Sequence, residues 1–190
     1  MRRGVFLDRD GVINRLAFNP LNSQYESPHK VEDFELYPWT LDSLSRLQQM
    51  DYLIFLVSNQ PSYAKGKTSM EALQEIQAML HRLLTQAGIT FTGYYYCFHH
   101  PESIVPELAP PCLCRKPGTL FLQQAADKYR LDLSASWFVG DQDSDIFCGQ
   151  RGGTRTILVT EERSAAKRGE SRPDYFADTL RDAVEIIRKS

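Results

Sequence analysis

The sequence predicts an α/β protein with a mostly parallel sheet that is covered by helices on both faces. Several short segments are apolar without alternation, as expected for strands buried on both faces; Val5-Phe6-Leu7 and Trp137-Phe138-Val139 are examples. They alternate along the chain with stretches in which apolar residues recur every three to four positions, as in amphipathic helices. The 190 residues suffice for one hydrophobic core, so we expect a single domain over residues 1–190.

The predicted strands and helices follow one another in a regular order. The strands cover residues 5–7, 52–57, 94–96, 137–139, 156–159 and an edge strand at 175–177. The helices cover residues 41–47, 68–83, 119–130, a short segment ending at 151, and 180–187. Thr68 and Glu71 have the spacing of a capping box that opens the second helix, and Gly88 stands where this helix ends. Residues 14–38 are expected to be irregular, and residues 161–172 to form a solvated, charged loop.

Composition excludes several classes of protein. The net charge of -2 gives no electrostatic basis for binding nucleic acid. No apolar run approaches the roughly 20 residues of a membrane span, and the N-terminus does not resemble a signal peptide. Four cysteines in such a chain favour reduced thiols and a cytoplasmic location. Without heptads or a spare apolar face, we expect a monomer that binds neither nucleic acid nor membrane.

Cys97, His99, Cys112 and Cys114 have the spacing C-x-H-(x12)-C-x-C, which offers three thiolates and an imidazole to one Zn²⁺ ion. Four protein ligands leave no open position, so we expect a structural zinc in a loop at about 97–114. His100 is an alternative to His99 as the ligand. The plainer interpretation is a set of buried thiols with a surface histidine. Zinc is favoured because the chain contains two close pairs of possible ligands, Cys97 with His99 and Cys112 with Cys114.

Polar residues follow three predicted strands at the point where each ends. Asp8 and Asp10 follow the first strand, Ser58 follows the second, and Asp141 and Asp145 follow the strand at 137–139. In parallel sheets, ligands bind at the carboxyl ends of the strands, near the switch point. Two neighbouring carboxylates need a cation, and oxygen ligands suit Mg²⁺. A carboxylate in such a site can also attack phosphorus, as in aspartyl-phosphate chemistry. Taken alone, Asp-x-Asp after a strand is more often a turn with a helix cap.

These motifs in combination resemble the haloacid-dehalogenase-type phosphatases. The segment Phe6-Leu7-Asp8-Arg9-Asp10-Gly11-Val12-Ile13-Asn14 is similar to the first motif of that family. Val57-Ser58-Asn59-Gln60, Cys114-Arg115-Lys116-Pro117 and Gly140-Asp141-x-x-x-Asp145 resemble the second, third and fourth motifs. The resemblance covers roughly residues 4–160 and implies a Rossmann-like sheet without a large cap domain. A C-x-H…C-x-C loop just before the lysine is typical of a zinc-bearing branch that acts on heptose bisphosphate or histidinol phosphate.

The resemblance implies a role for each motif residue. Asp8 would be the nucleophile and a Mg²⁺ ligand. Asp10 would protonate the leaving alcohol, then activate water, and its backbone carbonyl would bind Mg²⁺. Asp141 would complete the Mg²⁺ site, and Asp145 would orient Lys116 or a metal-bound water. Further expected roles are stabilisation of the phosphoryl group by Ser58 and Lys116, and substrate binding by Ser58, Asn59, Gln60, Arg115 and Lys116.

The long segment between His99 and Cys112 favours the heptose branch. The expected reaction is therefore removal of the 7-phosphate of D-glycero-D-manno-heptose 1,7-bisphosphate, a sugar bisphosphate. Histidinol-phosphate hydrolysis is one alternative. A zinc-stabilised binding domain without catalysis is another, although the intact carboxylates and Lys116 argue against it. Pro61, Lys65 and Gln142 depart from the family pattern and leave the substrate and its anomer open.

Overall fold

The computed structural model describes all 190 residues and contains one six-stranded parallel sheet with the strand order β5-β4-β1-β6-β7-β8. Its strands are β1 (Gly4–Leu7), β4 (Leu53–Asn59), β5 (Gly93–Cys97), β6 (Trp137–Gly140), β7 (Arg155–Val159) and β8 (Tyr175–Ala177). The chain moves outward from β1 through β4 to β5, then returns to the other side of β1 with β6. The switch point of the topology therefore lies between β1 and β6.

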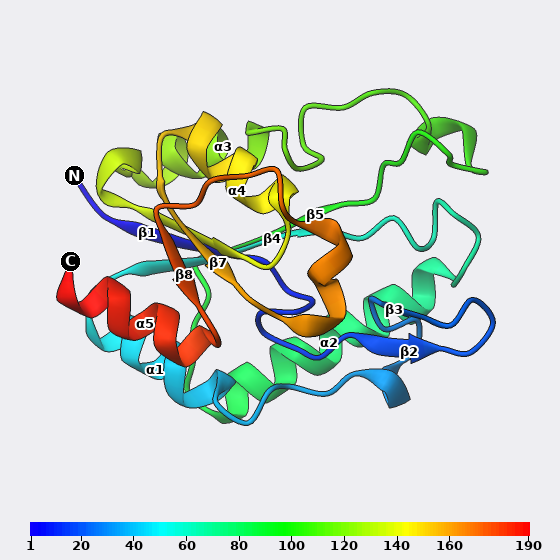
Figure 1. Cartoon of the computed structure of the whole chain (residues 1–190), viewed down its shortest axis with the longest axis horizontal. Coiled ribbons are helices and arrows are strands. Elements are labelled where there is room, and N and C mark those ends of the chain that lie inside the picture. The colour runs from blue at the N-terminus through cyan, green and yellow to red at the C-terminus, as the bar shows by residue number, and fades with distance from the viewer.

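Helices cover both faces of the sheet (Figure 1). They are α1 (Thr40–Gln49), α2 (Met70–Gln86), α3 (Leu120–Tyr129), α4 (Asp143–Gly152) and α5 (Leu180–Lys189). The cluster shared with α1, α2 and α5 is mainly aliphatic, whereas the cluster beneath α3 and α4 contains stacked aromatic rings. There Phe6 lies 5.0 Å from Phe55 and 6.3 Å from Phe138, measured between ring centroids. Because alternate strand residues enter each cluster, β1, β6 and β4 as far as Val57 are apolar, as predicted.

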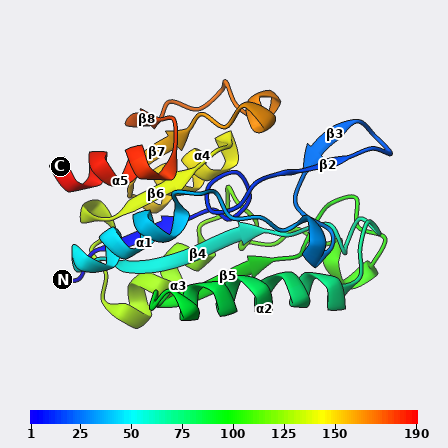
Figure 2. The ribbon, with the colours of Figure 1, turned by 90° about the horizontal axis from the view of Figure 1, so that it is seen from below.

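The segment predicted to be irregular contains a β-hairpin. Its strands, β2 (Ala17–Asn19) and β3 (Gln24–Glu26), pair antiparallel and lie beyond the carboxyl end of the sheet, away from both termini (Figure 2). Phe18 packs edge-on against Tyr25 across the hairpin. Three residues per strand and an exposed hydrophobic side chain give too weak a periodic pattern to be recognised in the sequence.

Two further predictions need correction. The second helix begins at Met70 with Ser69 as its cap, because the Ser69 hydroxyl accepts from the Ala72 amide at 3.1 Å. Thr68 instead donates its hydroxyl to the His29 carbonyl. The charged segment predicted as a solvated loop forms a 3₁₀ helix, Glu162–Lys167, that lies against the carboxyl edge of the sheet.

No helix has the length and apolar character needed to cross a membrane.

Candidate active site

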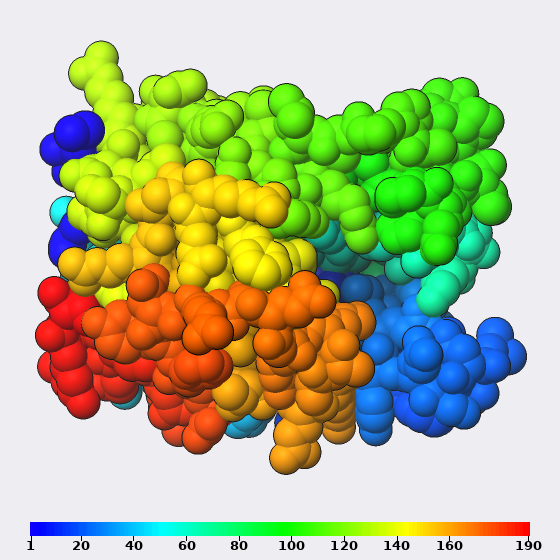
Figure 3. Space-filling model, turned by 45° about the horizontal axis from the view of Figure 1, so that its top comes forward, coloured from blue at the N-terminus to red at the C-terminus, as the bar shows by residue number.

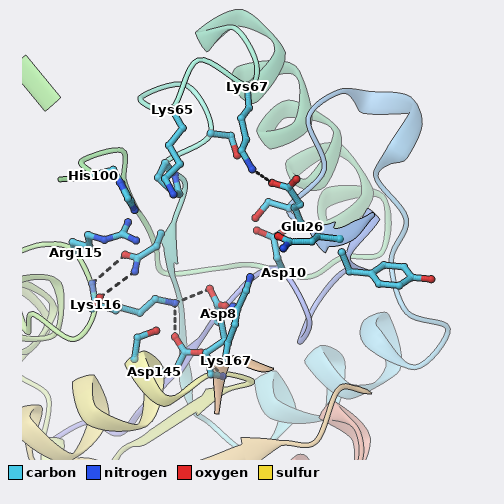
Figure 4. Close-up of a pocket in the computed structure, with 18 residues that line it drawn as sticks. Asp8, Asp10, Glu26, Lys65, Lys67, His100, Arg115, Lys116, Asp145 and Lys167 are labelled. Carbon is cyan, nitrogen blue, oxygen red and sulfur yellow. Dashed lines mark hydrogen bonds and ion pairs between the residues drawn. The ribbon is translucent and has the colours of Figure 1, made fainter. Parts of the chain in front are cut away.

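A polar pocket of about 460 Å³ opens at the carboxyl end of the sheet, and only one of its 18 lining residues is hydrophobic. Figure 3 shows, on one face, the orange segment after β7 beside the blue hairpin, with the green loop after β5 above them. The base of the pocket comes from the ends of β1 and β6, where the switch point lies. Figure 4 shows acidic side chains at the base and lysines around the rim. The fold thus gathers the predicted strand-end residues at one place.

Lys116 joins two of the predicted carboxylates. Its ammonium nitrogen lies 2.7 Å from an oxygen of Asp8 and 2.7 Å from an oxygen of Asp145, and it donates to the Val57 carbonyl at 2.9 Å. The side chain is almost fully buried. Burial alone would lower the pKa of Lys116, but the attraction of Asp145 and Asp8 outweighs it and raises this pKa. Lys116 is therefore a fixed positive charge at the base of the pocket.

The carboxyl group of Asp141 lies without a partner next to Lys116, Asp8 and Asp145. The residue is fully buried, and neither of its carboxylate oxygens has a hydrogen-bond partner. Single oxygens of Asp8, Asp141 and Asp145 lie within 4.8 Å of one another. Burial, followed by the charges of Asp8 and Asp145, raises the pKa of Asp141 well above its usual value. Burial likewise raises the pKa of Asp8 to about 6, despite Lys116. Three buried carboxylates and one lysine leave a deficit of positive charge that a divalent cation fits.

Local backbone conformation brings these carboxylates together. Gly11 has a φ of +91°, and a Cβ atom there would overlap the carboxylate of Asp141. Glycine thus permits both the turn after β1 and its close approach to the end of β6. Asp145 in the first turn of α4 accepts hydrogen bonds from the backbone amides of Asp141 and Gln142 at 3.2 and 3.0 Å. Together with the Gln142 side chain it forms a capping box that fixes the turn carrying Asp141.

Asp10 is held by three neighbouring side chains. Arg9, which is fully buried, donates to both of its carboxylate oxygens at 3.0 and 3.2 Å, and Asn14 donates at 2.9 Å. Gln60 donates to Asp10 at 2.6 Å and to the Ser58 hydroxyl at 2.9 Å. Burial would raise the pKa of Asp10, but Arg9 and these amide donors lower it below the usual value. The carboxylate is therefore ionised and fixed in orientation.

The four predicted zinc ligands form a compact cluster. The Cys97 sulfur lies 3.7 Å from that of Cys112 and 3.8 Å from Nδ1 of His99, and Cys114 lies 3.2–3.7 Å from the other three. Ligands at about 2.3 Å in a tetrahedral zinc site lie roughly 3.8 Å apart, so the cluster matches this donor set. His100 points elsewhere, because its Nδ1 accepts from the Glu102 amide at 3.0 Å.

The loop of the cluster is tied directly to the pocket. Arg115 donates to the His99 carbonyl at 3.1 Å and lines the pocket. The Asn59 side chain bridges the end of β4 and the backbone of Lys116, accepting from its amide at 3.0 Å and donating to its carbonyl at 3.2 Å. The loop that carries the Cys/His cluster therefore fixes the position of two basic residues.

Comparisons with known proteins support the same interpretation. The family model described as HAD-hydrolase-like matches residues 113–183. A D-glycero-alpha-D-manno-heptose-1,7-bisphosphate 7-phosphatase of Photorhabdus laumondii is 36% identical over 156 residues, covering 82% of this chain and 81% of the relative. The corresponding beta-anomer enzyme of Vibrio cholerae is 33% identical and covers 96% of this chain and 95% of its own length.

This chain belongs to the haloacid-dehalogenase (HAD) phosphatases, in the family of the heptose-bisphosphate phosphatases.

A solved structure with the same fold is the D,D-heptose 1,7-bisphosphate phosphatase of B. bronchiseptica complexed with magnesium and phosphate. It has a TM-score of 0.79 and 25% identity, and covers 99% of both chains. The Burkholderia thailandensis counterpart, at 20% identity and a TM-score of 0.69, supports the fold alone. As a HAD phosphatase, this chain has the Rossmann-like sheet without a large cap that its motifs predicted.

Two residues expected to contact substrate, Ser58 and Gln60, are buried and do not line the pocket. Gln60 is fully buried and bonds Asp10, Ser58 and Arg9, and the Ser58 side chain is 1% exposed. Asn59, Arg115 and Lys116 line the pocket, where they remain candidates for substrate binding. For Gln60, the geometry replaces the expected substrate contact with a role in holding Asp10.

Several pocket residues were missed because they lie on the hairpin and the 3₁₀ helix. Glu26 comes from β3 and forms an ion pair with Lys67, while Lys167 ends the 3₁₀ helix. Lys67 and the donors Asn22 and Asn19 outweigh burial and lower the pKa of Glu26 to about 2. None of these residues belongs to a HAD motif, and no local pattern distinguishes them from ordinary surface charges.

Gly140, at the end of β6, should be needed for activity although it has no side chain that could contact a ligand. A Cβ atom on Gly140 would overlap the side chain of Asp145, which holds both Lys116 and the turn of Asp141. We expect Gly140→Ala to reduce phosphatase kcat about 100-fold or more, because misplacement by about 1 Å has costs of this order. Steady-state phosphate release measures this. Gly88→Ala is the control, because nothing lies within 4 Å of the added atom; the φ of +68° at this position should lower stability, and kcat should be unchanged.

Proposed function

We propose that this phosphatase removes the 7-phosphate of D-glycero-D-manno-heptose 1,7-bisphosphate through an aspartyl-phosphate on Asp8. The observation that carries the proposal is the position of Lys116, 2.7 Å from both Asp8 and Asp145 at the base of a polar pocket. A buried carboxylate beside a fixed cation is suited to attack phosphorus, because the cation also attracts the phosphoryl oxygens. The names of the relatives at 33% and 36% identity support the substrate.

The residues divide the reaction between them. An oxygen of Asp8 attacks phosphorus, the bond from phosphorus to the sugar oxygen breaks, and Asp10 gives its proton to that oxygen. Asp10 then takes a proton from water, which attacks the phosphorus of the aspartyl-phosphate and releases phosphate. Asp10 is ionised in the empty pocket, but an arriving anionic phosphoryl group favours its protonated form. Arg9 and Asn14 keep its carboxyl group oriented during both proton transfers.

Two metals fit the side chains present. Asp8, Asp141 and the backbone carbonyl of Asp10 would hold Mg²⁺, whose charge would neutralise both the carboxylates and the phosphoryl oxygens. The buried, unpartnered oxygens of Asp141 support this assignment. Zn²⁺ would be held by the quartet of Cys97, His99, Cys112 and Cys114, and would keep the loop of Arg115 rigid. Thiolate ligands require reducing conditions, which supports a cytoplasmic location.

The pocket wall suits a phosphorylated polyol. Its lining is almost wholly polar, and Arg115, Lys65 and His100 place basic groups beside the zinc loop. Pro61, Lys65 and Gln142, the three departures from the family pattern, all line the pocket. They are therefore placed where they can alter the preference for one anomer.

A panel of substrates tests the proposal. With Mg²⁺ present, phosphate release is measured on the α and β anomers of heptose 1,7-bisphosphate and on histidinol phosphate. We expect kcat/KM for one heptose anomer to exceed that for histidinol phosphate by at least about 100-fold, since the bisphosphate gains a second ionic contact. A higher kcat/KM on histidinol phosphate would overturn the proposed substrate.

Asp10→Asn should slow the enzyme in a way that depends on the leaving group. A sugar alkoxide needs a proton on departure, whereas p-nitrophenolate leaves without one. We therefore expect kcat on the heptose bisphosphate to fall about 10³-fold, and kcat on p-nitrophenyl phosphate to fall at least tenfold less. Parallel phosphate-release assays compare the two losses. Equal losses on both esters would contradict the role of Asp10 as general acid.

A further inference from the structure

The 3₁₀ helix Glu162–Lys167 is fixed against the active site rather than free in solvent. The Ser164 hydroxyl, which is buried, lies 3.4 Å from the carbonyl of Asp141 and donates to the Glu161 carbonyl at 3.0 Å. Arg168 donates to the same Glu161 carbonyl at 2.6 Å. The Glu161 side chain accepts from the Tyr37 hydroxyl. The segment is thus attached to the turn that carries a proposed metal ligand.

The helix is also joined to the hairpin on the other side of the pocket. The guanidinium of Arg163 lies 4.7 Å from the centre of the Tyr25 ring and donates to the Leu16 carbonyl at 3.3 Å. Cation–π contact and hydrogen bond together restrict the helix from two directions. Lys167, its last residue, lines the pocket and extends toward the space above Asp8 (Figure 4).

The charges of the pocket leave Lys167 without a carboxylate partner. Lys65 pairs with Glu102, Lys67 pairs with Glu26, and Lys116 pairs with Asp8 and Asp145. The remaining pocket carboxylate, Asp10, is paired with Arg9. Every acidic residue that lines the pocket therefore already contacts another cation, and Lys167 forms no ion pair with any of them. An anchored cation with no internal partner, directed into a phosphatase pocket, is suited to bind an anion.

We propose that Lys167 is a specificity-determining residue that binds a phosphate group of the substrate from the 3₁₀ helix, on the wall away from the zinc loop. This inference rests on the proposed function and adds a residue outside the four HAD motifs. The phosphate is either the phosphoryl group being transferred or the second phosphate of a bisphosphate. A contact made equally in the ground state and the transition state changes KM and leaves kcat nearly constant.

The test compares Lys167→Met, Lys167→Arg and wild type on two pairs of substrates. The pairs are heptose 1,7-bisphosphate with heptose 7-phosphate, and fructose 1,6-bisphosphate with fructose 6-phosphate. We expect Lys167→Met to raise KM about 10-fold with less than a twofold change in kcat, and Lys167→Arg to restore most of the loss. A rise confined to the bisphosphates assigns the contact to the second phosphate, whereas an equal rise on the monophosphates assigns it to the transferred group.

Lys189→Met provides the matched control, because it removes the same charge from an exposed position at the end of α5. It should leave KM unchanged on all four substrates, and thermal unfolding should show that all variants are folded. Unchanged KM in Lys167→Met, or a fall in kcat that Lys167→Arg does not restore, would overturn the inference. Failure of the proposed function is distinct, because wild type would then release no phosphate from the heptose substrates. Inorganic phosphate should still raise the melting temperature of wild type more than that of Lys167→Met, and equal shifts would overturn the role of Lys167.

Discussion

Asp8→Asn is expected to reduce phosphate release from the heptose bisphosphate by about 10⁴-fold or more, because it removes the proposed nucleophile. Asparagine has nearly the same shape but lacks the negative oxygen that attacks phosphorus. Lys116 keeps its contact with Asp145 in the variant, so the base of the pocket should persist. Asp127→Asn, an exposed position on α3, is the matched control and should retain full activity.

The stability of the same variant gives an independent readout. The pKa of Asp8 is raised to about 6, chiefly by burial, so the native state binds its proton more tightly than the unfolded chain. In the metal-free protein, the stability contributed by the raised pKa of Asp8 is fully present below about pH 4 and is lost as pH rises through about 6. Without Mg²⁺, Asp8→Asn should therefore melt at a higher temperature than wild type at pH 7, and the difference should shrink at pH 4. A wild type that melts higher at pH 7 without metal would contradict this electrostatic picture.

Removal of the zinc cluster is the second large effect we expect. Cys112→Ser should lower zinc content, loosen residues 98–115 and reduce kcat/KM at least about 100-fold, because Arg115 and Lys116 lose their fixed loop. Metal analysis, limited proteolysis and phosphate release measure the three consequences. Cys148→Ser is the matched control. Cys148 lies outside the cluster, and its thiol donates only to the Gly118 carbonyl, so zinc content and loop protection should not change.

A zinc-free protein with unchanged activity would contradict the structural role of the cluster. Loss of activity with an intact, protease-resistant loop would contradict it as well, since the effect would then not arise from loop order. The Cys97–Cys112 and Cys97–His99 distances allow one tetrahedral ion, so metal analysis should give one zinc per chain in wild type.

Much of the site could be predicted because strand ends are easy to locate. Asp8 and Asp141 each follow a short, continuously apolar strand, and parallel strands end at the same edge of a sheet. Their order along the chain then predicts that they meet at the switch point. Asp145, four residues after Asp141, lies in the first turn of a helix, where its side chain can reach both that turn and Lys116. The spacing of the cysteines similarly indicated one compact cluster.

The remaining features depend on contacts between segments that are distant in the sequence. The hairpin is stabilised by Glu26 with Lys67, and the 3₁₀ helix by Arg163 with Tyr25, and neither pair is visible as a local pattern. Isolated hairpins and short 3₁₀ turns have little stability of their own, so their existence follows from such contacts. Gln60 was misplaced for the same reason. Its amide is buried by Arg9 and Asp10, whose orientation depends on the turn after β1.

The most direct test of the catalytic proposal is to trap the covalent intermediate. Wild type is mixed with the heptose bisphosphate and Mg²⁺, quenched in acid within milliseconds, digested and analysed by mass spectrometry. We expect the mass of one phosphoryl group on the peptide that contains Asp8, lost on treatment with hydroxylamine and absent in Asp8→Asn. A phosphoryl group on another residue, or rapid turnover by Asp8→Asn, would contradict the assignment of Asp8 as the nucleophile.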